Sequence, residues 1–329
     1  MYWYSAGTGT VQYSTDTKNK KILIPANSNY RYGNGTVQYL VPVNIVFLQL
    51  PHFFRNKKTI VKNSPKFPCI KMSEVKTIAI FGSTGNTGKE ILAAALEKGY
   101  KARVMVRNLS KLGESIKNNS NVTIFTGDFA NTEAIKNTVK GADYVISAVG
   151  GALGKPEDFP TGAFVEFIKV LVKIMKATPT VKAFLHQSGA FVPHPDGSQP
   201  FMMNLMRKIA AHPKIGRIGP NLTENENIMK YIHSIQHDDD IKFNMIVTRP
   251  GGLKPGRSID SVQLMASDTD IPMGMVTYSD LGRFTINAIE DEKLYGRYPY
   301  VVAKSSGSNI TSIIVIFSAV LAGYMMYRN

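Results

Sequence analysis

The sequence of 329 residues predicts an α/β protein built around a doubly wound parallel sheet. Two observations predict this fold class. Short apolar segments alternate with amphipathic helical segments from residue 72 to about residue 305, which is typical of a parallel sheet covered by helices on both faces. A glycine-rich turn also joins the first apolar segment to the first helical one, so that strand, turn and helix form one unit.

The expected elements follow one another along the chain. The first apolar strand, 76–82, leads into an amphipathic helix over 88–100 that is closed by Gly99. The later strand segments share runs of apolar and β-branched residues; they are 101–108, 121–128, 142–151, 181–190 and 242–253. The other helical segments repeat apolar residues at helical spacing; they are 131–142, 160–179 and 225–235. The methionine-rich stretch 200–212 is interpreted either as a mobile lid over an apolar pocket or as core packing.

Three glycines, Gly82, Gly85 and Gly88, stand three residues apart between the first strand and the first helix. In this context the first permits a tight turn, the second lets the backbone approach a pyrophosphate, and the third lets the helix pack close to the sheet. The helix N-terminus offers free N–H groups and a positive dipole end to phosphate. Small polar residues complete the expected phosphate-binding turn: Ser83, Thr84, Asn86 and Thr87. The pattern predicts a Rossmann fold that binds a dinucleotide.

Arg107 ends the second strand, 25 residues after Gly82. In NAD-binding folds an acid about 20 residues on accepts hydrogen bonds from the ribose hydroxyls, and no Asp or Glu stands here. A guanidinium instead pairs with the 2′-phosphate of NADP in a forked geometry. The sequence therefore predicts NADP(H) as the cofactor, and the alternative is a solvated surface arginine.

Seven segments between residues 75 and 303 carry a resemblance to a known family: "IAIFGSTGNTGKEIL", "VMVRN", "TGDF", "VISAVG", "HQSGAF", "VTRPGGL" and "YSDLGRFTINAIEDEKLYG". They resemble the atypical short-chain dehydrogenase/reductases. The most similar are the NmrA-like NAD(P)H-binding group, which includes the flavin/biliverdin-IXβ reductases.

The resemblance implies a role for each matching position. It implies that the glycine turn holds the pyrophosphate and that Arg107 holds the 2′-phosphate. Residues 128–129 would flank the adenine, 148–150 would line the nicotinamide ribose, and Ser188 with 249–252 would border the nicotinamide and substrate. The cofactor-binding residues implied beyond the turn are Arg107, Asp128, Phe129, Ala148, Val149, Gly150, Arg249, Pro250 and Gly251.

The body of the chain lacks the Tyr-x-x-x-Lys pair that serves typical members of the wider superfamily as proton donor, and Tyr231 has no lysine within reach along its helix. Reduction of a simple carbonyl gives an alkoxide that needs a positioned acid. A flavin, quinone or conjugated tetrapyrrole instead gives a delocalised anion that solvent can protonate, so binding and orientation suffice. The missing pair therefore narrows the expected substrate to a flat conjugated acceptor.

Ser188 is the candidate catalytic residue, because it follows the fifth strand at the edge where such folds place their sites. It would donate a hydrogen bond to the substrate or the carboxamide; the alternative is an ordinary turn serine. His186 is interpreted as a packed strand histidine, and His194 as either facing the pocket or solvated.

Residues 1–71 differ from the body, because they hold ten basic residues and a single acid, Asp16. They are interpreted as a disordered extension or a basic organelle leader. The net charge of +15 is concentrated there, so no nucleic-acid partner is expected. Cys69 is the only cysteine, which excludes an intramolecular disulfide, fits a reducing compartment and, with scattered histidines, predicts no metal site.

The C-terminal residues 306–329 are predicted to be a membrane anchor. No charged side chain occurs from 305 to 327, and an 18-residue helix from Ile310 to Tyr327 would measure about 27 Å, close to the roughly 27 Å core of the endoplasmic reticulum bilayer. The body would then face the cytosol at the endoplasmic reticulum or the mitochondrial outer membrane. The alternatives are a helix buried in the protein and a mitochondrial location through the basic leader.

The sequence thus predicts three parts: an extension or leader over 1–71, a Rossmann domain over 72–305 and an anchor over 306–329. The expected function is that of a membrane-anchored, NADPH-dependent oxidoreductase that transfers hydride to a flavin, a quinone or a tetrapyrrole-like acceptor. The alternative is a non-catalytic NADP(H)-binding redox sensor or scaffold. The expected partners are the small-molecule acceptor and, through the C-terminal helix, a membrane.

Overall fold

A computed structural model describes the backbone of residues 2–6, 9–13, 29–32 and 35–38, and it fully describes residues 75–150, 161–212, 218–256, 264–268, 270 and 275–303. The chain divides into two compact units, Met1–Lys71 and Met72–Asn329. In the first unit, two antiparallel hairpins form; they pair β1 (Tyr2–Ala6) with β2 (Gly9–Tyr13) and β3 (Asn29–Tyr32) with β4 (Gly35–Gln38). The sequence "GTVQ" occurs in both second strands, as Gly9–Gln12 of β2 and Gly35–Gln38 of β4, and the interpretation of residues 1–71 as a disordered extension or a leader stays a prediction.

The second unit is built on an eight-stranded sheet in the order β12-β14-β10-β9-β8-β5-β6-β7. All neighbours are parallel except β12, which is antiparallel to β14. Its strands are β5 (Thr77–Phe81), β6 (Lys101–Val106), β7 (Val122–Thr126), β8 (Tyr144–Ser147), β9 (Ala183–Gln187), β10 (Asn244–Pro250), β12 (Leu264–Ser267) and β14 (Tyr300–Ala303). The winding direction reverses between β5 and β8, so their carboxyl ends border the crevice where doubly wound folds bind ligands.

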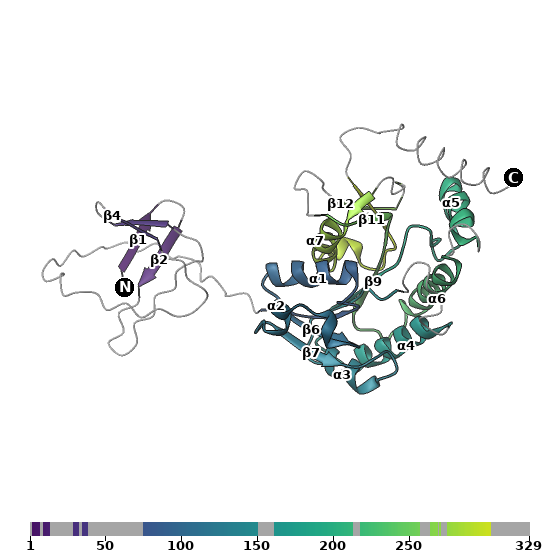
Figure 1. Cartoon of the computed structure of the whole chain (residues 1–329), viewed down its shortest axis with the longest axis horizontal. Coiled ribbons are helices and arrows are strands. Elements are labelled where there is room, and N and C mark those ends of the chain that lie inside the picture. The colour runs from purple at the N-terminus through teal and green to yellow at the C-terminus, as the bar shows by residue number, and fades with distance from the viewer. Residues whose placement is uncertain are drawn as a thin grey trace, which may run out of the picture. The chain divides into compact units, whose positions relative to one another are not determined.

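Helices cover both faces of this sheet. The helices of the described residues are α1 (Asn86–Glu97), α2 (Glu114–Lys117), α3 (Thr132–Val139), α4 (Ala163–Lys176), α5 (Phe201–Ala211), α6 (Gly219–Ile235) and α7 (Tyr278–Ala288). Figure 1 shows α1 and α7 on one side of the sheet and α3, α4 and α6 on the other. The two cores alternate along each strand: Ile78 and Ile80 pack into one, and Ala79 and Phe81 into the other. This double burial explains why the parallel strands read as continuous apolar runs.

The predicted fold class is confirmed, and the six predicted strands appear as β5 to β10 in chain order. The structure adds elements that the sequence analysis does not single out, namely α7, the edge strand β12 and its neighbour β14. A short parallel pair, β11 (Gly252–Lys254) with β13 (Met275–Thr277), lies outside the main sheet. Helix α7 packs closely on α1, because a Cβ at Gly282 would lie 2.6 Å from the carbonyl carbon of Glu90.

The predicted membrane anchoring needs correction. Among the residues that the structure describes, no helix is long and apolar enough to cross a membrane. The longest of them, α6, has 17 residues and carries the charged side chains of Glu224, Glu226 and Lys230. The segment 306–329, on which the prediction rested, lies outside the described residues. The predicted membrane localisation is therefore not retained, and the predicted membrane partner stays a prediction.

Candidate functional site

The turn after β5 is shaped by its glycines. Gly82 has a φ of +86°, in the left-handed region, and a Cβ there would lie 2.6 Å from the carbonyl oxygen of Ala148. The N–H of Gly85 donates to the carbonyl oxygen of Gly82 at 3.0 Å and closes the turn. A Cβ at Gly88 would lie 2.0 Å from that same carbonyl oxygen. The turn therefore brings β5, the start of α1 and the end of β8 together only because these positions lack side chains.

The N-terminus of α1 is open towards this crevice. No side chain caps the helix, and its first turn contains no acid, so its first N–H groups and the positive end of its dipole are available to an anion. Gly85 and Asn86 are exposed at this end, whereas Thr84 and Thr87 are half-buried. The Oγ of Ser83 is buried and has no hydrogen-bond partner among the described residues. Buried polar groups nearly always have a partner, so the turn fits a ligand that carries phosphate.

The residues expected to bind the adenosine half follow β6 and β7 at the same edge. Arg107 directly follows β6, the strand beside β5, and it is exposed. Asp128 accepts hydrogen bonds from the N–H groups of Ala130 and Asn131 at 3.0 and 3.1 Å, so its carboxylate caps its own turn. The ring of Phe129 packs 4.6 Å from that of Phe167 on α4. Arg107 thus lies next to the glycine turn, while Asp128 and Phe129 shape the turn after β7.

Residues 148–150 form the opposite wall of the crevice. The N–H of Ala148 donates to the carbonyl oxygen of Phe81 at 3.0 Å, which extends the pairing of β8 with β5 up to the glycine turn. Val149 is buried and Gly150 is exposed. Ala148 and Val149 therefore lie directly beside Gly82, and the lining of the nicotinamide ribose by residues 148–150 stays a prediction.

Ser188 lies at the carboxyl end of β9, where its N–H donates to the carbonyl oxygen of Thr248 at 2.9 Å. Its Oγ is buried and has no hydrogen-bond partner among the described residues. Ser188 and Ser83 thus present two unsatisfied hydroxyls at the carboxyl edge of the sheet. Each is available to a bound molecule.

The two histidines near Ser188 are held within the protein. His186 is fully buried with its Nδ1 3.3 Å from the Oγ of Ser147, and burial lowers the pKa of His186 to about 4, which keeps the ring neutral at pH 7. This agrees with its interpretation as a packed strand histidine. His194 is half-buried, and its Nδ1 lies 3.0 Å from a carboxylate oxygen of Asp196 in the same turn.

Arg249 does not extend into the crevice. It is only 2% exposed, its Nε donates to the carbonyl oxygen of Tyr298 at 2.7 Å, and its Nη1 donates to that of Val192 at 3.2 Å. Its guanidinium lies 3.9 Å from the ring centre of Tyr300. The next residue, Pro250, is buried and accepts a hydrogen bond from the N–H of Ala190 at 2.9 Å, and Gly251 after it is half-buried. Arg249 and Pro250 therefore form hydrogen bonds with the loop after β9.

The methionine-rich stretch forms α5, which the loop after Ser188 leads into. Only Met203 of this helix is buried, in a small cluster with Ala190 and Tyr300, while Phe201 is 80% exposed. The interpretation as plain core packing therefore holds for one side chain. The structure also shows a polar group that sequence reasoning missed: Gln199 donates from Nε2 to the carbonyl oxygen of Ala190 at 3.3 Å, while its buried Oε1 has no partner among the described residues. No sequence signal distinguishes this loop glutamine from a solvated one.

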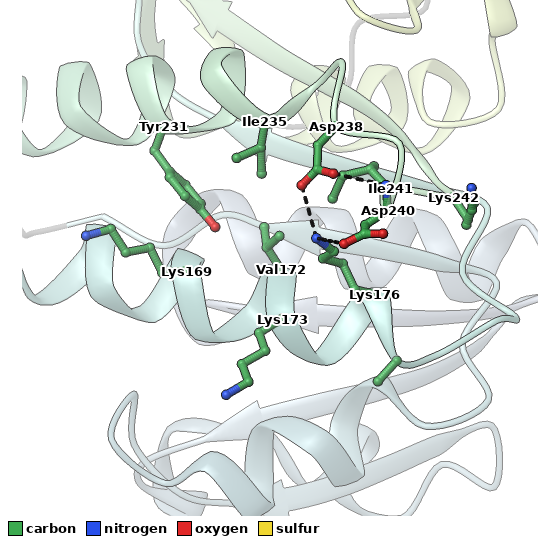
Figure 2. A pocket seen from close by; sticks show the side chains of 11 residues that line it. Lys169, Val172, Lys173, Lys176, Tyr231, Ile235, Asp238, Asp240, Ile241 and Lys242 are labelled. Carbon is green, nitrogen blue, oxygen red and sulfur yellow. Dashed lines mark hydrogen bonds and ion pairs between the residues drawn. The ribbon is translucent and has the colours of Figure 1, made fainter.

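A separate groove of about 780 Å³ lies between α4 and α6 (Figure 2). Its walls come from the C-terminal halves of both helices, so it opens at the amino edge of the sheet, away from the glycine turn. Lys176 there pairs with Asp238 at 3.1 Å and Asp240 at 3.4 Å, and lysines suit the negative end of the α4 dipole. Tyr231 also lines this groove, which separates it from the candidate cofactor site. The charged residues of the groove therefore serve ion pairs and the helix dipole, and Tyr231 is not placed to donate a proton in the candidate cofactor site.

Comparison with known proteins identifies the family. A sequence profile described as NAD(P)H-binding matches residues 82–292, starting at the first glycine of the turn. The chain belongs to this NAD(P)H-binding family. Eugenol synthase 1 from Petunia hybrida is 24% identical to it over 257 residues, which cover 76% of each chain. The isoflavone reductase homolog A622-like from Nicotiana tabacum is 29% identical over 137 residues, or 39% of this chain and 40% of that relative.

Solved structures share the fold of this NAD(P)H-binding protein. ChuY, described as an anaerobillin reductase from Escherichia coli O157:H7, matches with a TM-score of 0.52 at 15% identity and covers 71% of this chain and 100% of its own. A short-chain dehydrogenase/reductase from Veillonella parvula in complex with NADP matches with a TM-score of 0.51 at 16% identity, over 71% and 98% of the two chains. The resemblance to the atypical short-chain dehydrogenase/reductases, the NAD(P)H cofactor and the assignment as an oxidoreductase of this type are confirmed.

Proposed function

We propose that this chain is an NADPH-dependent reductase that transfers hydride to a flat conjugated acceptor, such as a flavin, a quinone or a tetrapyrrole. The observation that carries the proposal is Ser188, whose buried Oγ has no Tyr or Lys partner, nor any other, among the described residues. A site that protonates a localised alkoxide needs an acid within hydrogen-bond reach. An acceptor that delocalises the negative charge does not.

The chemistry divides simply between cofactor and protein. The nicotinamide supplies the hydride when it is bound. The acceptor takes up the hydride with its electron pair, becomes a delocalised anion and takes a proton from solvent. The glycine turn would hold the pyrophosphate, residues 148–150 would orient the nicotinamide ribose, and Ser188 would donate a hydrogen bond to the acceptor or carboxamide. Proximity and orientation then supply the rate enhancement.

Two further observations support this reading. The sequence places Arg107, and no Asp or Glu, at the end of β6 beside the glycine turn, which favours the 2′-phosphate of NADPH. Helix α5 follows the loop that carries Ser188 and leaves Phe201 80% exposed, and exposed aromatic and methionine side chains suit a flat apolar ligand.

The test is NADPH oxidation by the full-length protein with four acceptors: FMN, menadione, biliverdin and the unconjugated aldehyde hexanal. We expect turnover with at least one conjugated acceptor and none with hexanal. Reduction of hexanal at a comparable rate would contradict the proposal, because it needs a positioned acid. Binding of NADPH without turnover of any acceptor would instead favour the second candidate, a redox sensor or scaffold, which the same unpartnered Ser188 also permits.

A further inference from the structure

Arg249 is a buried cation that pairs with no carboxylate among the residues the structure describes. Its side chain is 2% exposed, and its Nε and Nη1 donate to two neutral main-chain carbonyls, those of Tyr298 and Val192. No carboxylate of the described residues lies within ion-pair distance of it. The negative charges of Asp268 and Asp196 act on Arg249 from a distance. The carboxylate of Asp268 pairs with Arg297, and that of Asp196 pairs with His194.

Burial of a charge without a counter-charge is costly. The two carbonyl dipoles and the ring of Tyr300 offset part of that cost, the ring by a cation–π contact at 3.9 Å. They do not neutralise the charge, because a guanidinium stays protonated in proteins. The positive potential of Arg249 therefore extends into its surroundings, where low polarisability weakens screening.

The fold places the backbone of Arg249 beside that of Ser188. Thr248 of β10 is in register with Gln187 of β9, so the next residues along, Arg249 and Ser188, are neighbours on adjacent parallel strands. Both residues lie on the same face of the sheet. Side chains two or four residues apart along a strand share a face. Val247, two residues before Arg249, and Phe184, four residues before Ser188, both pack into the same core.

Arg249 also fixes the loop that follows Ser188. Its Nη1 binds the carbonyl oxygen of Val192, four residues beyond Ser188. Its Nε binds the segment that enters β14, through Tyr298. One side chain thus holds both segments together and carries the positive charge at this edge.

We propose that Arg249 is an electrostatic positioning residue that selects acceptors bearing or developing negative charge beside Ser188. This rests on the proposed function, and it gives the substrate class more closely: a conjugated acceptor with an anionic group on or next to the ring that accepts the hydride. The charge of Arg249 stabilises the anion formed by hydride transfer through space, without a direct contact. A unit charge roughly 8 Å away at an effective dielectric constant of about 20 changes a rate or binding constant by on the order of tenfold to a hundredfold.

The test compares two acceptors that share one ring, 1,4-naphthoquinone and 1,4-naphthoquinone-2-sulfonate. Arg249→Gln should lower kcat/KM for the sulfonate roughly ten times more than for the neutral quinone. Arg249→Lys keeps the charge but loses the fork, and it should retain most of the wild-type ratio between the two quinones. Two results would show that Arg249 only joins loops. In the first, Arg249→Gln lowers kcat/KM equally for both quinones. In the second, Arg249→Lys changes the ratio of the two kcat/KM values as much as Arg249→Gln does.

Arg103 offers a matched control. Its Nε and Nη2 donate to the carbonyl oxygens of Thr138 at 3.1 Å and Asn137 at 2.6 Å, and its guanidinium lies 4.8 Å from the ring centre of Phe125. It therefore has the same kind of contacts as Arg249, but it lies near the amino end of β6. Arg103→Gln should lower the melting temperature without changing the ratio of the two quinones.

Equilibrium binding separates this inference from the proposed function. The sulfonate is titrated into the NADP⁺-saturated protein, where no turnover occurs, and Arg249→Gln should raise its Kd about tenfold while the Kd of NADP⁺ changes less than threefold. If the wild type turns over neither quinone, nor FMN, menadione or biliverdin, and Arg249→Gln still shows this Kd shift, the reductase is refuted and the anion selectivity is kept. An unchanged sulfonate Kd in a folded Arg249→Gln protein would refute the selectivity alone.

Discussion

Substitution of Gly88 by alanine tests the glycine turn most directly. A Cβ at this position would lie 2.0 Å from the carbonyl oxygen of Gly82, 2.6 Å from its carbonyl carbon and 2.9 Å from the Cα of Ser83. All three are backbone atoms, so no rotamer change relieves the overlap. Because Cβ contacts under 3.0 Å are essentially never seen, the start of α1 must move away from the turn by about 1 Å.

This displacement acts on cofactor affinity and on stability. A misplacement of about 1 Å in a binding constellation costs on the order of a hundredfold, and overpacking typically lowers the free energy of unfolding by roughly 1–3 kcal/mol. We expect Gly88→Ala to raise the Kd of NADPH about a hundredfold in a fluorescence titration. Urea unfolding followed by circular dichroism should show the loss of stability.

Gly113 is the matched control, because it has a φ of −66° and its added Cβ would lie 3.9 Å from the Ser115 Oγ, an ordinary contact. Gly113→Ala should leave the Kd of NADPH and the unfolding free energy nearly unchanged. A folded Gly88→Ala protein that binds NADPH as tightly as the wild type would refute the placement of the pyrophosphate on this turn.

Three further predictions concern the same domain. A charge-assisted hydrogen bond is worth about 1.5–3 kcal/mol, so the wild type should bind NADPH roughly ten- to a hundredfold tighter than NADH, and Arg107→Glu should erase or reverse this preference in titrations of both cofactors. Ser188→Ala should lower kcat by roughly tenfold or less; complete loss of turnover with intact cofactor binding would make Ser188 an essential proton donor instead. Burial raises the pKa of Glu290, but hydrogen bonds from one tyrosine and two lysines outweigh burial and lower it to about 2, below the ordinary 4.5. This carboxylate therefore stabilises the fold above about pH 4.5 and loses that contribution as the pH falls towards 2. In thermal melts, Glu290→Gln should lower the free energy of unfolding by about 1–2 kcal/mol at pH 7, after allowance for solvent screening. At pH 2.5 the same substitution should have little effect.

The sheet and the glycine turn could be predicted from the sequence because local pattern and tertiary environment agree there. Strands such as β5 are buried on both faces, so every residue of β5 after Thr77 is apolar and the segment is unambiguous. The glycines of the turn are dictated by contacts within one strand–turn–helix unit. A property that depends on few, near neighbours is visible in a short stretch of sequence.

The remaining parts depend on contacts that are distant along the chain. Strand β14 has four residues and is defined by its pairing with β10 and β12, which no local pattern encodes. The resemblance implies that Arg249 contacts the cofactor, whereas its side chain binds the carbonyl oxygens of Val192 and Tyr298. Glu224 likewise reads as a surface acid, yet it is buried and accepts hydrogen bonds from the N–H groups of Gly162 and Val165 at the start of α4. The positions of strand β14 and of these two side chains are therefore set by the packing of elements that are far apart in the sequence.

The two edges of the sheet differ in how well their polar groups are satisfied, and this difference locates the site. At the amino edge, the carboxylate of Asp143 accepts from the N–H of Thr77 at 2.9 Å and pairs with Lys182 at 2.7 Å, while Glu290 pairs with Lys76 at 2.6 Å. At the carboxyl edge, the buried hydroxyls of Ser83 and Ser188 and the Oε1 of Gln199 have no partner among the described residues. Packing alone does not favour buried donors and acceptors without partners. These groups gather at the edge that also carries the uncapped start of α1 and Arg249, which pairs with no carboxylate of the described part of the chain. A bound dinucleotide and an anionic acceptor would supply the missing partners.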